Sequence, residues 1–179
     1  MLSNSATHWG ALTRTLHWLI AALILVQFAL GWIGHEMDDT PAKVTWMIGH
    51  KSVGVTILLL TVFRLSWRLP QNRPVAPTGI AIWQHRAAVS AHWALYALVL
   101  GLAIAGWVIA DTSRIPWNLW WVIPLPDWLG PAKDLHEVAE EAHEFLAWSL
   151  FAVIALHVLA ALWHQFVRRD DTLRRMWSG

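Results

Sequence analysis

The sequence has no cysteine and little charge. The absence of cysteine in its 179 residues excludes disulfide bonds, thiolate metal sites, iron–sulfur clusters and covalent haem attachment through a C-x-x-C-H motif. Charged residues make up only 14% of the chain, against about 25% in soluble domains. The chain also opens without a hydrophobic stretch that leads to a small-residue cleavage site, so we expect no removable signal peptide. Hydrophobic residues make up 56% and the mean hydropathy is +0.43, which predicts an integral membrane protein.

Four segments have the length and apolar character of membrane-spanning helices. About 20 mostly apolar residues cross the hydrocarbon core of a bilayer as a helix. The segments that qualify are residues 15–35, 47–67, 87–110 and 142–166. We therefore predict an all-α membrane protein in which residues 1–179 form a single domain, a bundle of four transmembrane helices.

Basic residues are concentrated on one side of these predicted spans. Nine arginines fall on the side of the two termini and the middle connection, namely Arg14, Arg64, Arg68, Arg73, Arg86, Arg168, Arg169, Arg174 and Arg175. The other side has only Lys43, Lys51, Arg114 and Lys133. Because an excess of Lys and Arg marks the cytoplasmic face, we predict that both termini are cytoplasmic and that the first and third connections face the periplasm or an equivalent outer compartment.

The predicted outer face is acidic. Ten carboxylates lie on or near it, namely Glu36, Asp38, Asp39, Asp111, Asp127, Asp134, Glu137, Glu140, Glu141 and Glu144. Such a surface favours cationic partners over anionic ones, unless a local patch of Lys51, Arg114 and Lys133 reverses the potential. The Trp-rich stretch around Trp117, Trp120, Trp121 and Trp128 is expected either to cover this face or to anchor the protein at the membrane interface.

Histidines within the spans form two sets at matched depths. His143 and His157 are fourteen residues apart on one predicted helix, so they share a face and are displaced by roughly 21 Å along the axis. His50 begins the second span at the depth of His143, and His17 begins the first span at the depth of His157. Ionisable side chains in a membrane are costly and usually functional. Each set is suited to place an imidazole on either side of a haem iron.

Two other histidines near the cytoplasmic face leave alternatives open. His92 lies near the inner end of its span and therefore competes with His17 as the partner of His157. His92 and His164 are also candidates for a quinone site, because an imidazole hydrogen-bonds a carbonyl and exchanges protons near neutral pH. For each of them the alternative is an interfacial histidine that hydrogen-bonds to the backbone.

Two other classes of protein fit the sequence less well. Glu140 and His143 form a Glu-x-x-His pair, which di-iron carboxylate bundles use twice. Here the pair occurs once, and no other span supplies carboxylates inside the bilayer. A purely structural bundle leaves histidines at two matched depths unexplained. Nothing in the sequence indicates nucleic acid as a partner.

Several stretches together resemble the bacterial cytochrome b561 family. They are LHWLIA with His17, GHKSVG with His50, SAHWALYALVLGLAIAG with His92, and AHEFLAWSLFAVIALHVLAALWHQF with the remaining histidines. The IPWNLWWVIPLP loop and the RRDDTLRRM tail are also similar, so the resemblance covers almost the whole chain. It implies two haem b groups, an outer one held by His50 and His143 and an inner one held by His17 and His157.

The resemblance also implies a location in the bacterial inner membrane and a function. Short, stand-alone members of the family look like superoxide oxidases, which pass electrons from periplasmic superoxide to ubiquinone. The expected cofactors are therefore two haem b groups, with ubiquinone as an exchangeable substrate. The alternative is an electron-transfer cytochrome b subunit that serves a periplasmic redox protein such as a dehydrogenase, a hydrogenase or a cytochrome c, because those subunits share the scaffold.

Overall fold

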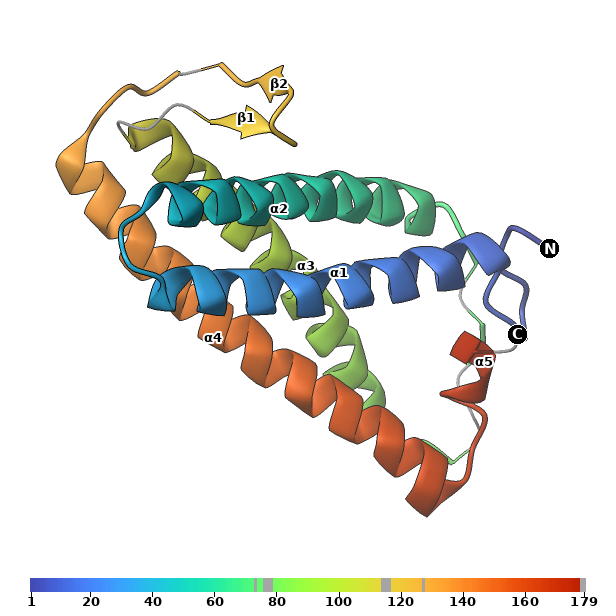
Figure 1. The fold of residues 1–179 in the computed structure, drawn as a ribbon. Coiled ribbons are helices and arrows are strands. Elements are labelled where there is room, and N and C mark those ends of the chain that lie inside the picture. Colours follow the sequence, from blue (N-terminus) through green and yellow to red (C-terminus); the bar gives the residue numbers. More distant parts are fainter. Residues whose placement is uncertain (73, 76–78, 114–116, 127, 178–179) are drawn as a thin grey trace.

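Four long helices make up most of the structure. The computed structural model describes residues 1–72, 74–75, 79–113, 117–126 and 128–177 (Figure 1). The helices are α1 (Ala11–Glu36), α2 (Pro41–Arg68), α3 (Ile82–Thr112) and α4 (Lys133–Trp163). All four are long and apolar enough to cross a membrane. The prediction of a four-helix membrane bundle is confirmed.

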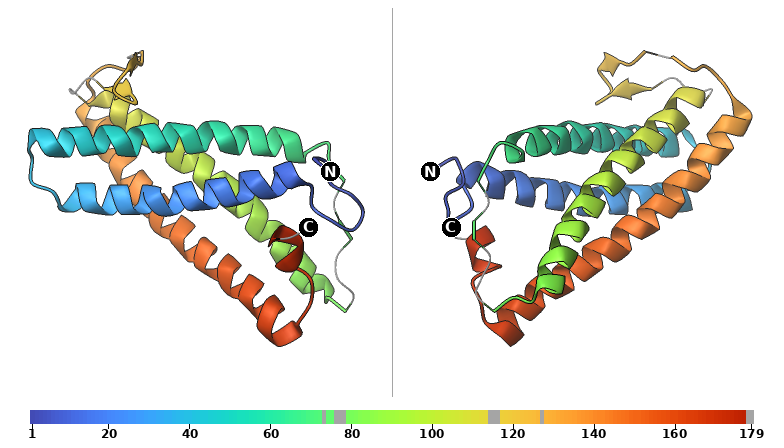
Figure 2. Two further views of the ribbon diagram at one scale, coloured as in Figure 1. Left: turned by 45° about the vertical axis from the view of Figure 1, so that its right-hand side comes forward. Right: turned by 180° about the vertical axis from the view of Figure 1, so that it is seen from behind.

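The helices pair as two hairpins. α1 packs along α2, α3 packs along α4, and α2 also contacts α3. The first hairpin crosses the second at an angle (Figure 2). Both termini and the connection between α2 and α3 lie at one end of the bundle, which we call the termini end (Figure 1). The α1–α2 turn and the α3–α4 connection lie at the opposite end, which we call the hairpin end.

Local sequence signals explain where some of the helices begin. Pro41 occupies the first turn of α2, and the Thr40 side chain accepts a hydrogen bond from the Lys43 backbone N–H. Proline and a capping threonine both favour a helix start. At the start of α3 the Gln84 side chain accepts from the Ala81 backbone N–H at 3.0 Å. Each contact satisfies a polar group that a helix terminus would otherwise leave unpaired.

Helix α4 begins earlier than the sequence predicts. It starts at Lys133, whereas the apolar pattern places the start of the last span at residue 142. The intervening residues are mostly charged and exposed. They extend the helix beyond the apolar stretch, because helical hydrogen bonding continues where the chain no longer needs to be hydrophobic.

The hairpin end is closed by a short β-hairpin and the termini end by the last residues of the chain. Strands β1 (Asn118–Leu119) and β2 (Ile123–Pro124) pair antiparallel. After α4 the chain forms one π-helical turn, η1 (His164–Arg168), and then reverses at Arg169, whose φ is 57°. The short helix α5 (Arg174–Trp177) follows, and the Trp18 indole N–H donates to the Met176 carbonyl at 2.8 Å. The C-terminal segment is thereby tied to the start of α1.

The core lies where the two hairpins meet. Val53, Ile57, Val99 and Leu150 are buried against one another, and many large apolar side chains on the outer faces of the helices are exposed. Exposed apolar side chains suit helices surrounded by lipid, where close packing supplies the contacts between helices. Arg73, Arg114 and Asp127, which were counted in the charge distribution, lie outside the described residues.

Candidate functional site

At the hairpin end, α2 and α4 bring two histidines together. The imidazole rings of His50 and His143 have centroids 6.3 Å apart and planes inclined at 72°. The sequence predicts this pair from depth alone, and the structure places the two rings opposite each other with their planes steeply inclined.

At the termini end, α1 and α4 bring together a second pair. The ring centroids of His17 and His157 are 6.2 Å apart, with planes inclined at 67°. His92 on α3 is also present there, with its ring centroid 5.4 Å from that of His157. His157 therefore has two imidazole neighbours, and the competition seen in the sequence between His17 and His92 is a feature of the structure.

The spacing within each predicted pair suits a metal ion between the rings. A metal–nitrogen bond is about 2 Å long, and a five-membered ring with ordinary C–N bonds has a radius of roughly 1.1 Å. Two imidazoles on opposite sides of one ion therefore have centroids about 6.2 Å apart. The separations of 6.2 and 6.3 Å match this value, and the separation of 5.4 Å between His92 and His157 is shorter.

Two glycines leave room for the rings at the hairpin end. A Cβ atom on Gly31 of α1 would lie 3.0 Å from Cε1 of His50, and one on Gly106 of α3 would lie 3.2 Å from Cε1 of His143. Both distances are tighter than ordinary van der Waals contact. Larger side chains at these two positions would displace the imidazoles, so glycine here preserves the site.

Hydrogen bonds orient the hairpin-end rings. Nδ1 of His143 lies 3.1 Å from the Leu102 carbonyl, which only accepts, so Nδ1–H donates and Nε2 remains free for a metal. Nε2 of His50 lies 3.2 Å from the side-chain nitrogen of Gln27. The amide nitrogen only donates. Nδ1 of His50 and Oε1 of Gln27 are both buried and have no partner among the described residues. Buried polar atoms without partners are rare, and they indicate a site that lacks a component.

The termini-end pair has charged neighbours instead. A guanidinium nitrogen of Arg64 lies 3.1 Å from Nδ1 of His17. The Arg64 and Arg68 guanidinium carbons lie 5.7 and 5.5 Å from the centre of the Tyr96 ring. Both arginines belong to α2, one turn apart, and Tyr96 lies on α3.

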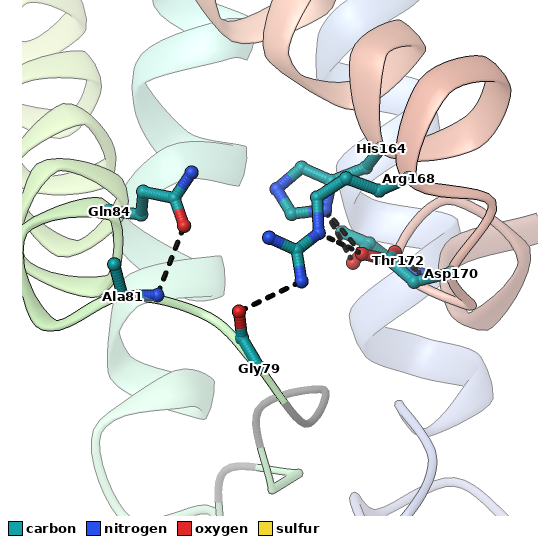
Figure 3. A network of polar contacts seen from close by, with 7 residues as sticks. All are labelled: Gly79, Ala81, Gln84, His164, Arg168, Asp170 and Thr172. Atoms are coloured by element: carbon teal, nitrogen blue, oxygen red, sulfur yellow. Dashed lines mark hydrogen bonds and ion pairs between the residues drawn. The ribbon is translucent and has the colours of Figure 1, made fainter.

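His164 is separated from both pairs and belongs to a polar network at the termini end. Its Nδ1 lies 2.6 Å from an Asp170 carboxylate oxygen, and Arg168 donates to the Gly79 carbonyl at 3.0 Å (Figure 3). Partial burial by itself raises the pKa of Asp170, but hydrogen bonds from Thr172 and His164 lower it below its usual value. The network fixes the reversal of the chain after α4.

The Trp-rich connection packs against the hairpin-end site. Gly49 precedes His50 in the chain, and a Cβ atom on Gly49 would lie 3.6 Å from the Trp121 ring. The Trp120 backbone N–H donates to the buried Ser52 hydroxyl at 2.8 Å, and Lys51 Nζ lies 5.6 Å from the centre of the Trp117 ring. Asp111 is buried and accepts from the backbone N–H groups of Trp128 and Leu129. These contacts make the connection a cover over this end of the bundle.

The di-iron alternative gains no support from the described residues. The Glu140 carboxylate lies 3.3 Å from Nε2 of His136, one turn earlier on α4. Within the described residues, no group of three or more His, Asp or Glu side chains is placed to hold a bare metal ion. A porphyrin supplies four nitrogens of its own, so a haem iron needs only two protein ligands.

Sequence reasoning missed three residues at the site. Gln27 and Gly31 have no motif that marks them, and their proximity to His50 follows from how α1 packs on α2. The charge distribution counts Arg64 only among the basic residues of the termini side, yet this arginine contacts His17. An arginine inside an apolar span was the available signal, since such residues usually have a functional partner.

Known proteins similar to this chain point to one family. A family model described as prokaryotic cytochrome b561 matches residues 8–179. Cytochrome b561 homolog 2 of Escherichia coli (strain K12) is 30% identical over 177 residues, which is 97% of this chain and 93% of that protein. The probable superoxide oxidase CybB of Yersinia pestis is 31% identical over 172 residues, 94% of each chain. Cytochrome b561 homolog 1 of E. coli is 25% identical over 165 residues, with 90% and 92% covered.

Proposed function

Because this chain belongs to the prokaryotic cytochrome b561 family, we propose that it is a di-haem cytochrome that moves electrons across the bacterial inner membrane. The family implies haem b and electron transfer in a bacterial membrane. The proposal adds two haems, a periplasmic donor, which we take to be superoxide, and ubiquinone as acceptor. It treats residues 1–179 as a single cytochrome b561-type domain with both termini in the cytoplasm.

The observation that carries the proposal is the pair of matched ring separations. His50 with His143 and His17 with His157 each have the spacing of two imidazoles that share one ion. The positions on α4 are about 21 Å apart along the helix axis, so the two sites lie at two depths. The glycines beside the hairpin-end pair support the same assignment. Nε2 of His50 accepts from the Gln27 amide, so Gln27 must release this nitrogen when a metal binds there.

Each residue has a defined role in this proposal. His50 and His143 hold the haem at the hairpin end, and His17 and His157 hold the haem at the termini end. His17 is preferred to His92 because only the His17–His157 separation matches that of an ion-bridged pair. Haem b, when bound, supplies an iron that takes up and releases one electron at a time.

The electron balance is simple. Two superoxide ions each give up one electron at the hairpin end and leave as O₂. One ubiquinone takes up the two electrons together with two protons and leaves as ubiquinol. Lys51 beside His50 supplies a positive charge that attracts an anionic donor, although most of the ionisable groups at this end are acidic.

His92 and His164 remain the two candidates for the quinone site. His92 lies directly beside His157, and His164 is paired with Asp170 at the termini end. An imidazole that hydrogen-bonds a quinone oxygen also passes it a proton, and the Asp170 carboxylate holds the His164 ring in one orientation. Cytoplasmic protons reach either histidine if the termini end faces the cytoplasm, as its arginines favour.

A second function is favoured by one observation. Eight carboxylates at the hairpin end are exposed in the structure: Glu36, Asp38, Asp39, Asp134, Glu137, Glu140, Glu141 and Glu144. Such a surface attracts a cationic redox protein more readily than an anion. In this alternative the chain is the membrane subunit of a dehydrogenase or hydrogenase, or receives electrons from a cytochrome c.

One experiment separates the two functions. The purified protein is expected to show a b-type spectrum with close to two haems per chain, and a colourless protein would end both interpretations. A superoxide pulse should reduce the haems rapidly, and added ubiquinone should reoxidise them. Slow reduction by superoxide, together with fast reduction by a cationic reduced cytochrome c, identifies the subunit instead.

A further inference from the structure

The termini end holds guanidinium groups that lack carboxylate partners. None of the ion pairs within the described part of the chain includes Arg14, Arg64 or Arg68. The two carboxylates of the C-terminal segment are already engaged, Asp170 with His164 and Arg168, and Asp171 with Arg174. A cation within a span is costly unless something offsets its charge.

Of these cations, Arg64 is the one that contacts both α1 and α3. One guanidinium nitrogen contacts His17, and the group lies against the face of Tyr96. Its Nε is buried and has no acceptor within the described residues. Nε and one terminal nitrogen form the edge of a guanidinium that binds a carboxylate through two parallel hydrogen bonds.

The contact between Arg64 and His17 is incompatible with a metal on His17. A guanidinium only donates, so Nδ1 of His17 accepts from Arg64, and the proton of the neutral ring is then on Nε2. A ring in that state has no free nitrogen for iron. Arg64 must therefore release His17 and find another partner when this site is loaded.

We propose that Arg64 exchanges His17 for a propionate carboxylate of the haem at the termini end, and so fixes the orientation of that haem. This inference rests on the proposed function. Arg68 remains against Tyr96, whose hydroxyl lies 3.5 Å from an Arg68 nitrogen, and limits where Arg64 moves. Before haem binds, His17 is the partner of Arg64. After haem binds, the propionate carboxylate takes the place of His17.

The test uses the His143→Ala variant, which keeps only the termini-end site. Haem-free protein is titrated with haem b and with its dimethyl ester, in which both propionates are capped. Absorbance gives the affinity for each. We expect the ester to bind about tenfold or more weakly than haem b, the loss usual for an outer partner of a metal site.

Arg64→Gln provides the decisive arm. In the His143→Ala background, Arg64→Gln should lower the affinity for haem b by a similar factor and leave the affinity for the ester unchanged. The variant should then bind haem b and its ester equally well. Arg64→Lys keeps the charge and should restore part of the preference. The exposed Arg86 of α3 is at the same end, and Arg86→Gln is the matched control, which should behave as the parent.

The remaining outcomes are also decisive. If Arg64→Gln distinguishes haem from its ester as strongly as the parent does, the inference is wrong. If the variant binds haem normally but loses copurifying anionic lipid, the partner of Arg64 is a lipid phosphate, which also overturns it. If His143→Ala binds neither haem nor ester although the protein is folded, it is the proposed termini-end haem site that has failed.

Discussion

The two histidine pairs have almost the same internal geometry and very different surroundings. Ring separations of 6.2 and 6.3 Å and inclinations of 67° and 72° make the pairs equivalent as candidate ligands. The hairpin-end rings contact neutral groups, namely the Leu102 carbonyl, the Gln27 amide and two glycines, and Lys51 follows His50 in the chain as a nearby cation. The termini-end pair is surrounded by Arg64, Arg68 and the extra imidazole of His92.

This difference in surroundings is expected to set the direction of electron transfer between the two sites. Cations near a haem stabilise the reduced form, which has one positive charge fewer than the oxidised form, and so raise its reduction potential. Like ligands in unlike surroundings are therefore expected to differ in potential. Electrons that enter at the hairpin end would then move energetically downhill toward the termini end.

The largest expected effect comes from removing one ligand of each pair. His143→Ala should leave only the termini-end haem and His157→Ala only the hairpin-end haem, each with about half the parental haem content by pyridine haemochrome assay. Redox titration of the two variants should then show the higher potential in His143→Ala, by on the order of tens of millivolts. Equal potentials would show that the cations at the termini end have no electrostatic effect on the haem.

A smaller effect is expected from filling the space beside His143. Gly106→Ala places a Cβ 3.2 Å from the ring. Overpacking of this kind costs about 1–3 kcal/mol, which corresponds to a loss of about fivefold to a hundredfold in haem affinity. The loss should be confined to the hairpin end. Gly101→Ala on the same helix is the control, because its Cβ would meet Leu146 at an ordinary 3.5 Å. Equal losses in the two variants would argue against a haem beside Gly106.

Lys51 tests the hairpin end as an entry point for an anion. Lys51→Gln should slow haem reduction by superoxide several-fold at low ionic strength, and added salt should reduce the difference. Lys133→Gln is the control, because Lys133 is exposed and lies 3.6 Å from Glu137, which already offsets its charge. A rate that is insensitive to Lys51 and to salt would favour a protein donor.

The smallest expected effect concerns Asp170 and is limited to the termini end. Its lowered pKa means that the folded state binds the proton more weakly than the unfolded state, so the stabilisation is complete above the ordinary pKa of 3.8. It is lost as the pH falls through the lowered folded-state pKa. Asp170→Asn should reduce the Tm at pH 7 by roughly a few degrees and remove the acid dependence. Asp171→Asn, at a more exposed ion pair, should change the Tm less.

The sequence relates residues within one helix and pairs the histidines of different helices by depth, but it does not identify the other neighbours of their rings. The spacing of His143 and His157 follows from helical periodicity, and apolar length gives the four spans. The partners of the rings depend on how the hairpins cross. Gly106 adjoins His143 and Gly31 adjoins His50, whereas Gly49 meets Trp121 and Gly101 meets Leu146, and only the packing of the helices distinguishes these glycines. The early start of α4 was missed because polar residues extend a helix without an apolar signal.

The division into two hairpins also has a consequence for biosynthesis. Each histidine pair takes one member from the first hairpin and the other from α4, the last span to be made. A growing chain therefore completes neither pair until α4 has left the ribosome and entered the membrane. If these pairs hold the haems, cofactor uptake would act as a test of completion, and a chain that ends before α4 is expected to stay colourless.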